Sequence, residues 1–195
     1  MKIKTLLGKE IIPYIPKIAE LRIAIFREYP YLYEGEMSYE ERYLLMYSQT
    51  SHAMLVIAED DHRVVGAVTG LPLTESMEEI KDLFLNKHIP SERIFYLGEI
   101  VLLQEYRKKN IGYLMYQQFE KAIKEMGLYE KIALCEVVRA KNDLRKPPNY
   151  QSLNRFWERQ GDLKRPDLIA NFSWKEIGAA KETKKPMVFW IKDCF

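Results

Sequence analysis

A basic turn between an apolar run and a helical pattern is the part of the sequence best suited to binding an anion. Arg107, Lys108 and Lys109 follow the apolar run 94–103, and helical periodicity begins at Ile111. Such a turn brings together unpaired backbone N–H groups, the positive end of a helix dipole and three cationic side chains. These features favour a phosphate site, whereas the simpler alternative is a solvated basic turn that only begins a helix.

Two residues of this turn have backbone properties that a phosphate site would use. Gly112 lies in the first turn of the expected helix, where the lack of a side chain lets a ligand approach the backbone closely. Asn110 is the non-glycine residue type that best tolerates a positive φ. The sequence therefore predicts an irregular turn that presents its backbone N–H groups.

A resemblance to a known family rests on this turn and on the strand before it. The GNAT superfamily of acetyl-CoA dependent N-acetyltransferases has a strand followed by R/Q-x-x-G-x-G/A. Arg107–Gly112 resembles this motif, except that Asn110 replaces the first glycine. Glu99–Arg107 is similar to the family's E-L-x-V-x-P-x-x-R, with Gln104 in place of the proline.

A second segment extends the resemblance toward the C-terminus. Phe156–Asp162 is similar to the family's L-Y-x-x-x-G-F, with Trp157 where a tyrosine is usual and Asp162 where a phenylalanine is usual. The close resemblance covers Ile94–Gly161, and the remaining segments agree in the order of their elements. It implies one GNAT acetyltransferase domain over residues 1–195.

The resemblance implies acetyl-CoA as cosubstrate, and neither a metal nor a cysteine nucleophile, because the amine attacks the thioester directly in a ternary complex. Backbone groups of residues 102–104 would pair with the pantetheine arm like an added strand, and an N–H near Leu102 would polarise the thioester carbonyl. The pyrophosphate would lie on N–H groups of residues 107–112. The residues assigned to the coenzyme are Ile100, Val101, Leu102, Leu103, Gln104, Arg107, Lys108, Lys109, Asn110, Ile111, Gly112, Tyr113 and Trp157.

Glu99 is the candidate general base. An acceptor amine with a pKa near that of lysine, about 10.4, arrives protonated and must lose a proton before it attacks. A carboxylate inside an apolar strand otherwise carries an unexplained cost of desolvation. The alternative is a structural glutamate that a neighbouring arginine or tyrosine satisfies. Tyr96, three residues earlier, is a candidate to share the role through a water.

Trp157 removes the usual general acid, because an indole N–H cannot protonate a leaving thiolate. A thiol with a pKa near 8.5 is a tolerable leaving group near neutral pH, so activity does not require that acid. Tyr150 and Tyr116 are candidate substitutes, although packing is the commoner role for each of the 13 tyrosines.

Two further sets of charges border the expected site. A basic set in the loop 139–148 is predicted to be a solvated charge run, with a phosphate contact as the alternative; its members are Arg139, Lys141, Arg145 and Lys146, with the acid Asp143 among them. An acidic set, in connections that border the acceptor pocket in the family, is expected to favour a cationic acceptor; its members are Glu34, Glu36, Glu75, Glu78 and Glu79.

Hydrophobic periodicity predicts the elements that position these residues. Strands are expected at 2–7, 53–58, 64–71, 94–103, 131–138, 168–177 and 187–194. Helices are expected at 11–27, from a Ser38 capping box to about 50, at 77–85, 111–126 and 150–160. This order predicts an α/β fold in which a central mixed sheet of about seven strands has helices on both faces, with a parallel crossover over residues 94–138.

Composition narrows the class of protein. The 195 residues allow one domain with a substantial core, and the net charge of +2 provides no global field for nucleic acid or membrane binding. There is no membrane-spanning or secretory segment, so a cytoplasmic protein is expected. Cys135 and Cys194 are too few for a disulfide framework. The three histidines lack the spacing of metal ligands.

The expected function is N-acetylation of a primary amine on a small molecule, an aminoglycoside-like compound or a peptide. A degenerate GNAT-fold protein that binds acyl-CoA as a sensor or partner-binding module without turnover is the alternative. A nucleotide-binding protein is disfavoured because neither G-x-G-x-x-G nor G-x-x-x-x-G-K-[ST] occurs. The sequence leaves open both the acceptor amine and a homodimer.

Overall fold

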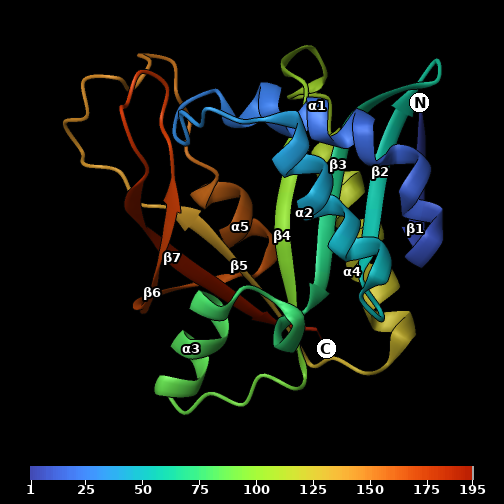
Figure 1. Cartoon of the computed structure of the whole chain (residues 1–195). Helices are drawn as coiled ribbons and strands as arrows, with labels where there is room; N and C mark the ends of the chain where they lie inside the picture. The colour runs from blue at the N-terminus through green and yellow to red at the C-terminus, as the bar shows by residue number, and fades with distance from the viewer. Residues whose placement is uncertain (195) are drawn as a thin grey trace.

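Seven strands form one open sheet in the order β1-β2-β3-β4-β5-β7-β6 in a computed structural model that describes residues 1–194 (Figure 1). The β4–β5 pair is parallel and every other adjacent pair is antiparallel. The strands are β1 (Lys2–Leu7), β2 (Met54–Asp60), β3 (Arg63–Pro72), β4 (Ile94–Leu102), β5 (Lys131–Val137), β6 (Leu163–Trp174) and β7 (Thr183–Asp193). The predicted α/β class, the mixed sheet of about seven strands and the parallel unit are confirmed.

Helices cover both faces of this sheet. The α-helices are α1 (Ile15–Phe26), α2 (Met37–Gln49), α3 (Glu78–Asn86), α4 (Ile111–Met126) and α5 (Asn154–Gln160), and the 3₁₀ helices are η1 (Gly8–Tyr14), η2 (Leu73–Glu75) and η3 (Gln104–Tyr106). In Figure 1, α1 and α2 lie in front of the sheet and α4 lies behind it. Helix α5 packs on the same apolar cluster as α4, through Trp157.

Several expected element boundaries need correction. Residues 11–14 belong to a 3₁₀ helix rather than to α1, β6 ends at Trp174 rather than Ile177, and β7 begins at Thr183 rather than Met187. Ser38 does not begin α2, because the helix starts after Glu36, whose carboxylate accepts a hydrogen bond from the Ser38 hydroxyl. Helix α5 begins at Asn154 rather than at Tyr150, and residues 150–153 form no regular element. Strand β6 begins at Leu163, five residues before the expected start. The first half of the strand is largely exposed, so a search for apolar runs does not detect it.

A β-bulge in β4 decides which side chains share a face. Thr69 of β3 pairs with Glu99, but the next residue, Gly70, pairs with Leu97, so Gly98 is an extra residue in β4. Thr69 and Leu71, two residues apart in β3, lie on the same face, and their partners Glu99 and Tyr96 therefore lie on it too. Without the bulge, residues three apart in a strand would face opposite sides.

Gly98→Ala is expected to destabilise the fold by about 1–3 kcal/mol, because an added methyl overpacks the bulge. A Cβ at Gly98 would lie 2.5 Å from the Tyr47 hydroxyl and 2.8 Å from the Thr69 hydroxyl. Urea denaturation measures the change. Gly112→Ala is the matched control, since a Cβ at Gly112 meets no atom within 4 Å. Equal stability of the two variants would show that the space over the bulge is not tight.

Candidate active site

The parallel pair β4–β5 separates halfway along its length. Residues Ile94–Leu97 pair with Lys131–Leu134, and the pairing ends there. Strand β4 continues to pair with β3 up to Leu102, and β5 continues to pair with β7 up to Val137. The last residues of both strands therefore face a split in the sheet, and in Figure 1 β5 leans away from β4. The split exposes one edge of the segment predicted to contact pantetheine.

The turn after β4 has the predicted irregular backbone. Lys108 has a φ of 60° and Asn110 a φ of 64°, both in the left-handed region. Asn110 is the N-cap of α4 but makes no side-chain cap hydrogen bond, and the first turn of α4 contains no acidic residue. The first N–H groups of this 16-residue helix therefore have no carboxylate partner of their own.

Arg107 does not extend over this turn. Its guanidinium donates hydrogen bonds to both carboxylate oxygens of Glu28, at 2.7 and 3.1 Å, and its Nε donates to the Leu102 carbonyl at 2.9 Å. The side chain thus ties the end of β4 to the loop after α1. The Lys109 ammonium lies 5.5 Å from the Tyr106 ring centroid. A phosphate at this turn would meet backbone N–H groups and lysines rather than the arginine.

Glu99 is buried and ion-paired on the face covered by α1 and α2. Its side chain is 4% exposed, and its Oε2 accepts a hydrogen bond from Nη1 of Arg22. The Nε of Arg22 donates to Oε2 of Glu40, which is fully buried. Sequence analysis left open a glutamate satisfied by an arginine, and Arg22 is that arginine. Oε1 of Glu99 and Oε1 of Glu40 are buried without a hydrogen-bond partner in the described chain.

Arg22 and Glu40 were not among the predicted site residues, although their positions along the helices carry a signal. Arg22 lies four residues after the buried Ile18 and four before Phe26, on the apolar stripe of α1. A charged residue on an apolar stripe requires a buried partner. Glu40 likewise lies four residues before the buried Leu44.

Tyrosine hydroxyl groups surround the ion-paired carboxylate. The hydroxyls of Tyr43 and Tyr47 lie 2.9 Å apart, and the Arg22 guanidinium lies 4.4 Å from the Tyr43 ring centroid. Burial, the neighbouring phenol and the charge of Glu99 hold the pKa of Tyr43 well above its usual value. Burial and Glu99 raise the pKa of Tyr47 to about 12. Both phenols are therefore neutral near pH 7 and act as dipoles rather than charges.

The two tyrosines predicted to take part in proton transfer lie on different elements. The Tyr96 hydroxyl is 3.2 Å from the Cys135 sulfur, and burial raises the pKa of Tyr96 well above its usual value and that of Cys135 to about 12. Tyr150 lies in the loop after β5, where its ring packs edge-on against Tyr29 at 4.7 Å. Burial also raises the pKa of Tyr150. The bulge brings Tyr96 to the same face of the sheet as Glu99. No hydrogen bond between Tyr150 and Glu99 occurs within residues 1–194.

Trp157 lies in the core rather than on an open surface. It is 3% exposed, its ring centroid is 5.7 Å from that of Tyr116, and its indole N–H has no acceptor within residues 1–194. The Tyr116 hydroxyl donates to Asp162 at 3.2 Å. This bond commits Tyr116 to a structural contact and weakens its case as a substitute acid.

Asp162→Asn is expected to stabilise the fold at neutral pH. Burial raises the pKa of Asp162 from 3.8 to about 6. Its charged form is therefore disfavoured in the folded state, and stability falls as pH rises from about 4 to about 6. A shift of about two units corresponds to about 3 kcal/mol, an upper bound on the gain in the neutral variant at pH 7.5. Urea denaturation at pH 4 and pH 7.5 measures it, and an equal difference at both values would contradict the prediction.

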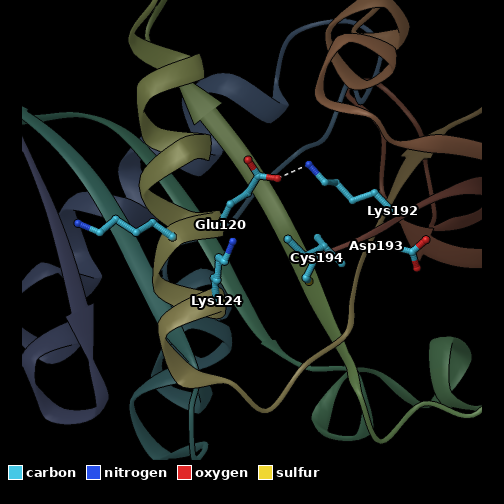
Figure 2. A pocket seen from close by; sticks show the side chains of 7 residues that line it. Glu120, Lys124, Lys192, Asp193 and Cys194 are labelled. Atoms are coloured by element: carbon cyan, nitrogen blue, oxygen red, sulfur yellow. Dashed lines mark hydrogen bonds and ion pairs between the residues drawn. The ribbon is translucent and has the colours of Figure 1, made fainter.

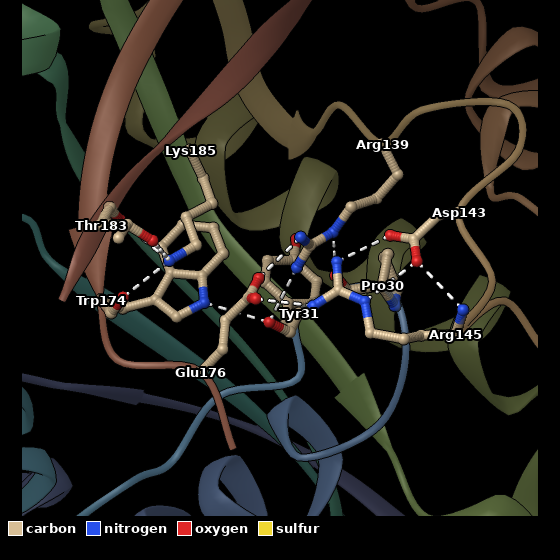
Figure 3. A network of polar contacts seen from close by, with 9 residues as sticks. All are labelled: Pro30, Tyr31, Arg139, Asp143, Arg145, Trp174, Glu176, Thr183 and Lys185. Carbon is tan, nitrogen blue, oxygen red and sulfur yellow. Dashed lines mark hydrogen bonds and ion pairs between the residues drawn. The ribbon is translucent and has the colours of Figure 1, made fainter. Parts of the chain in front are cut away.

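A network of polar contacts holds the loop between α1 and α2 against two other segments (Figure 3). Arg139 donates to the carbonyls of Pro30 and Tyr31 at 2.6 and 3.0 Å and lies 2.6 Å from a carboxylate oxygen of Glu176. The indole N–H of Trp174 also donates to the Tyr31 carbonyl, at 3.0 Å. The loop is thus tied to the segment after β5 and to the end of β6.

This network corrects the expectation of a solvated charge run for Arg139, whereas Lys141, Arg145 and Lys146 are exposed as expected. The Arg139 side chain is 11% exposed, and Arg145 bonds to both Asp143 and Glu176. Both arginines are therefore used in protein contacts rather than in a phosphate contact. The network fixes Tyr31, whose pKa is raised by burial and by charges that include Glu136 and Glu99.

The acidic residues expected to attract a cationic acceptor are partly neutralised. Glu34 pairs with Lys175 and Glu78 with Lys81, each at 2.7 Å. Glu36 accepts the Ser38 hydrogen bond described above. Glu75 and Glu79 are exposed residues of η2 and α3. The preference for a cationic acceptor therefore stays a prediction with weaker support from these residues.

Two cavities lie away from Glu99. One of about 260 Å³ lies between the C-terminal half of α4 and the end of β7 (Figure 2); its lining residues are Glu120, Lys121, Lys124, Ile132, Lys192, Asp193 and Cys194. Another of about 450 Å³ lies between α1 and the β2–β3 hairpin and touches the site only through Leu103. Within residues 1–194 no cluster of three potential metal ligands occurs. In the same range, no helix combines the length and hydrophobicity of a membrane span.

The fold combines an open mixed sheet, a parallel strand pair that separates halfway, and a basic turn at the N-terminus of α4. Residues 18–146 match the model of the Acetyltransferase (GNAT) family. The chain belongs to this family. No significant match was found among curated proteins.

Solved structures share the fold. Ribosomal-protein-alanine N-acetyltransferase from Brucella melitensis has a TM-score of 0.64 at 11% identity, over 99% of both chains. The loading GNATL domain of CurA from Lyngbya majuscula has a TM-score of 0.63 at 12% identity, over 100% of this chain and 98% of that one. An aminoglycoside 6'-N-acetyltransferase complexed with coenzyme A has a TM-score of 0.59 at 16% identity, over 100% and 98%. Such low identities show the GNAT fold alone.

Proposed function

We propose that the protein transfers an acetyl group from acetyl-CoA to a primary amine, by direct attack of the amine on the thioester. The observation that carries the proposal is the position of Glu99, beside the split between β4 and β5 that the uncapped helix α4 follows. In this proposal the proton acceptor Glu99 lies at one end of residues 99–112, and the coenzyme binds along the rest of the segment. The coenzyme A complex of the aminoglycoside enzyme supports the choice of donor.

The residues around the split fit acetyl-CoA. The edge of Ile100–Leu102 that faces β5 has no β-ladder partner and suits the amides of a pantetheine arm. The N–H groups after Asn110, with Lys108 and Lys109 beside them, suit the pyrophosphate. Space over Gly112 lets the phosphates approach the backbone. When bound, acetyl-CoA supplies the activated acetyl group.

The roles of the side chains follow from their positions. Oε1 of Glu99 accepts the proton that the acceptor ammonium must lose, because its other oxygen is held by Arg22. A backbone N–H near Leu102 polarises the thioester carbonyl. Tyr96 relays a proton on the same face, and Tyr150 is the candidate to protonate the leaving thiolate because its phenol remains protonated at neutral pH.

A panel of amines assayed for free thiol release tests the proposal. The panel contains aminoglycosides, polyamines and peptides with a free N-terminus or lysine, each at low and high salt. Release that depends on one class of amine is expected. A cationic acceptor recognised by charge gives rates that fall with salt. Binding of acetyl-CoA without thiol release for any amine would contradict the transferase.

The second candidate is a protein that binds acyl-CoA without turnover. It is favoured by two observations at the positions of the expected acid and base. Trp157 replaces the usual acid and is buried in the core, and Glu99 is ion-paired with Arg22. Calorimetric binding of acetyl-CoA together with an inactive amine panel is its expected signature.

A further inference from the structure

Two buried carboxylates share one buried guanidinium beneath the split. Arg22 donates through Nη1 to Glu99 and through Nε to Glu40, so the two acids are bridged by different nitrogens. The three residues are 8, 7 and 0% exposed, respectively. They come from α1, β4 and α2, which places one ionic cluster across three elements.

The charge of this cluster does not cancel. With both acids counted as ionised, one guanidinium and two carboxylates sum to −1, and each carboxylate keeps one oxygen without a partner in the described chain. Burial acts to lower the pKa of Arg22, but attraction from Glu99 and Glu40 outweighs it and holds that pKa well above its usual value. Arg22 is thus permanently charged. A lone structural glutamate would need only the arginine, so the second acid needs an explanation.

We propose that Arg22 and Glu40 are positioning residues that orient the Glu99 carboxylate and set the pH at which it can accept a proton from the acceptor amine. This inference rests on the proposed acetyltransfer. Arg22 holds Oε2 and leaves Oε1 for the substrate. Glu40 draws part of the charge of Arg22 away from Glu99, so that the catalytic carboxylate is not fully neutralised.

Other groups that face Glu99 do not supply the opposing charges. The titratable groups on the surrounding elements are Tyr43 and Tyr47 on α2, Tyr31 on the loop before α2, Tyr96 on β4, and Cys135 and Glu136 on β5. Burial raises the pKa of the four tyrosines and of Cys135, so they are neutral near pH 7. Tyr33 contacts Glu40 rather than Glu99. The Glu136 carboxylate pairs with Lys164 at 3.0 Å. Arg22 is therefore the charged group that bonds to Glu99, and Glu40 is the second acid that bonds to Arg22.

The proposal gives shifts of opposite sign in two variants. Arg22→Gln removes the cation that is bonded to Glu99, so the acid limb of the pH–rate profile is expected to move to higher pH. Glu40→Gln removes a competing carboxylate, so Arg22 acts more strongly on Glu99 and the acid limb moves to lower pH. Because Arg22 bridges the two acids, the effect of Glu40→Gln should differ in size between the wild type and the Arg22→Gln background, so the two changes are expected to be non-additive in the double variant.

The experiment measures rate per folded molecule against pH for the wild type, both single variants and the double variant. Arg22→Lys, which keeps the charge, should restore the limb close to the wild-type position. Glu59→Gln is the control, because it breaks the Lys4–Glu59 ion pair on β1 and β2 and should leave the limb unchanged. Titration of the Glu99 carboxyl carbon by NMR, assigned by its loss in Glu99→Gln, follows the same shifts without turnover.

The outcomes separate this inference from the proposed function. Shifts of opposite sign in the single variants, with a double variant whose shift is not their sum, support it. Unchanged limbs and unchanged carboxyl titration in folded variants would overturn it and leave Arg22 and Glu40 purely structural. If the wild type shows no amine-dependent thiol release, the transferase fails, while the carboxyl titration still decides whether the pair sets the charge of Glu99. If Arg22→Gln does not fold, Glu40→Gln decides alone, because its shift must be to lower pH.

Discussion

Glu99→Gln is expected to lower turnover by about 10²- to 10⁴-fold while leaving the affinity for acetyl-CoA nearly unchanged. Glutamine keeps the size of the side chain and an oxygen for Arg22, but it cannot take a proton from an ammonium group. The wild-type rate should rise with pH through the coupled ionisation of base and amine. The rate of the variant should rise only as free amine appears in solution. Steady-state rates and calorimetry on the same two proteins measure both quantities.

The Arg22–Glu99 ion pair makes a stability measurement an essential control for this variant. Loss of one carboxylate leaves Arg22 paired with Glu40 alone, so some loss of stability is expected in either case. A purely structural Glu99 predicts lost stability with activity per folded molecule preserved. An unchanged rate in a stably folded variant would remove Glu99 from the catalytic residues, and absence of turnover in both proteins with coenzyme binding intact would favour the non-catalytic protein.

The sequence predicted those parts of the site that depend on neighbours along the chain. The turn 107–112 was predictable because its left-handed asparagine, its lysines and the start of α4 are all local features. Strands and the long helix were predictable from their periodicity, and β1 and α4 have the expected bounds. These features follow from backbone sterics and from burial of one face, which short windows of sequence record.

The parts that the sequence did not predict depend on contacts between distant segments. Arg22 and Glu99 are 77 residues apart, and alternation in β4 without a bulge would have placed Tyr96 and Glu99 on opposite faces. Only Gly98 within the strand hinted at the bulge. The basic set in loop 139–148 has a composition typical of solvated charge. Arg139 instead donates hydrogen bonds to the carbonyls of Pro30 and Tyr31, which are more than 100 positions away in the sequence. The local preferences of residues for helix, strand or turn contain no information about contacts with such distant residues.

Gly112→Val is expected to weaken acetyl-CoA binding by about 10- to 100-fold, because a branched side chain would occupy the space through which phosphate reaches the first N–H groups of α4. A Cβ at this position meets no atom of the protein within 4 Å, so the substitution should cause no steric clash in the fold. Valine is also no worse a helix former than glycine. The expected loss is therefore one of binding and not of stability, which calorimetry and urea denaturation separate. Leu114→Val is the matched control, since it places valine in the same turn at a side chain that is already 44% exposed, and it should bind as the wild type does. Undiminished affinity in a folded Gly112→Val protein would move the phosphate site away from the turn 107–112.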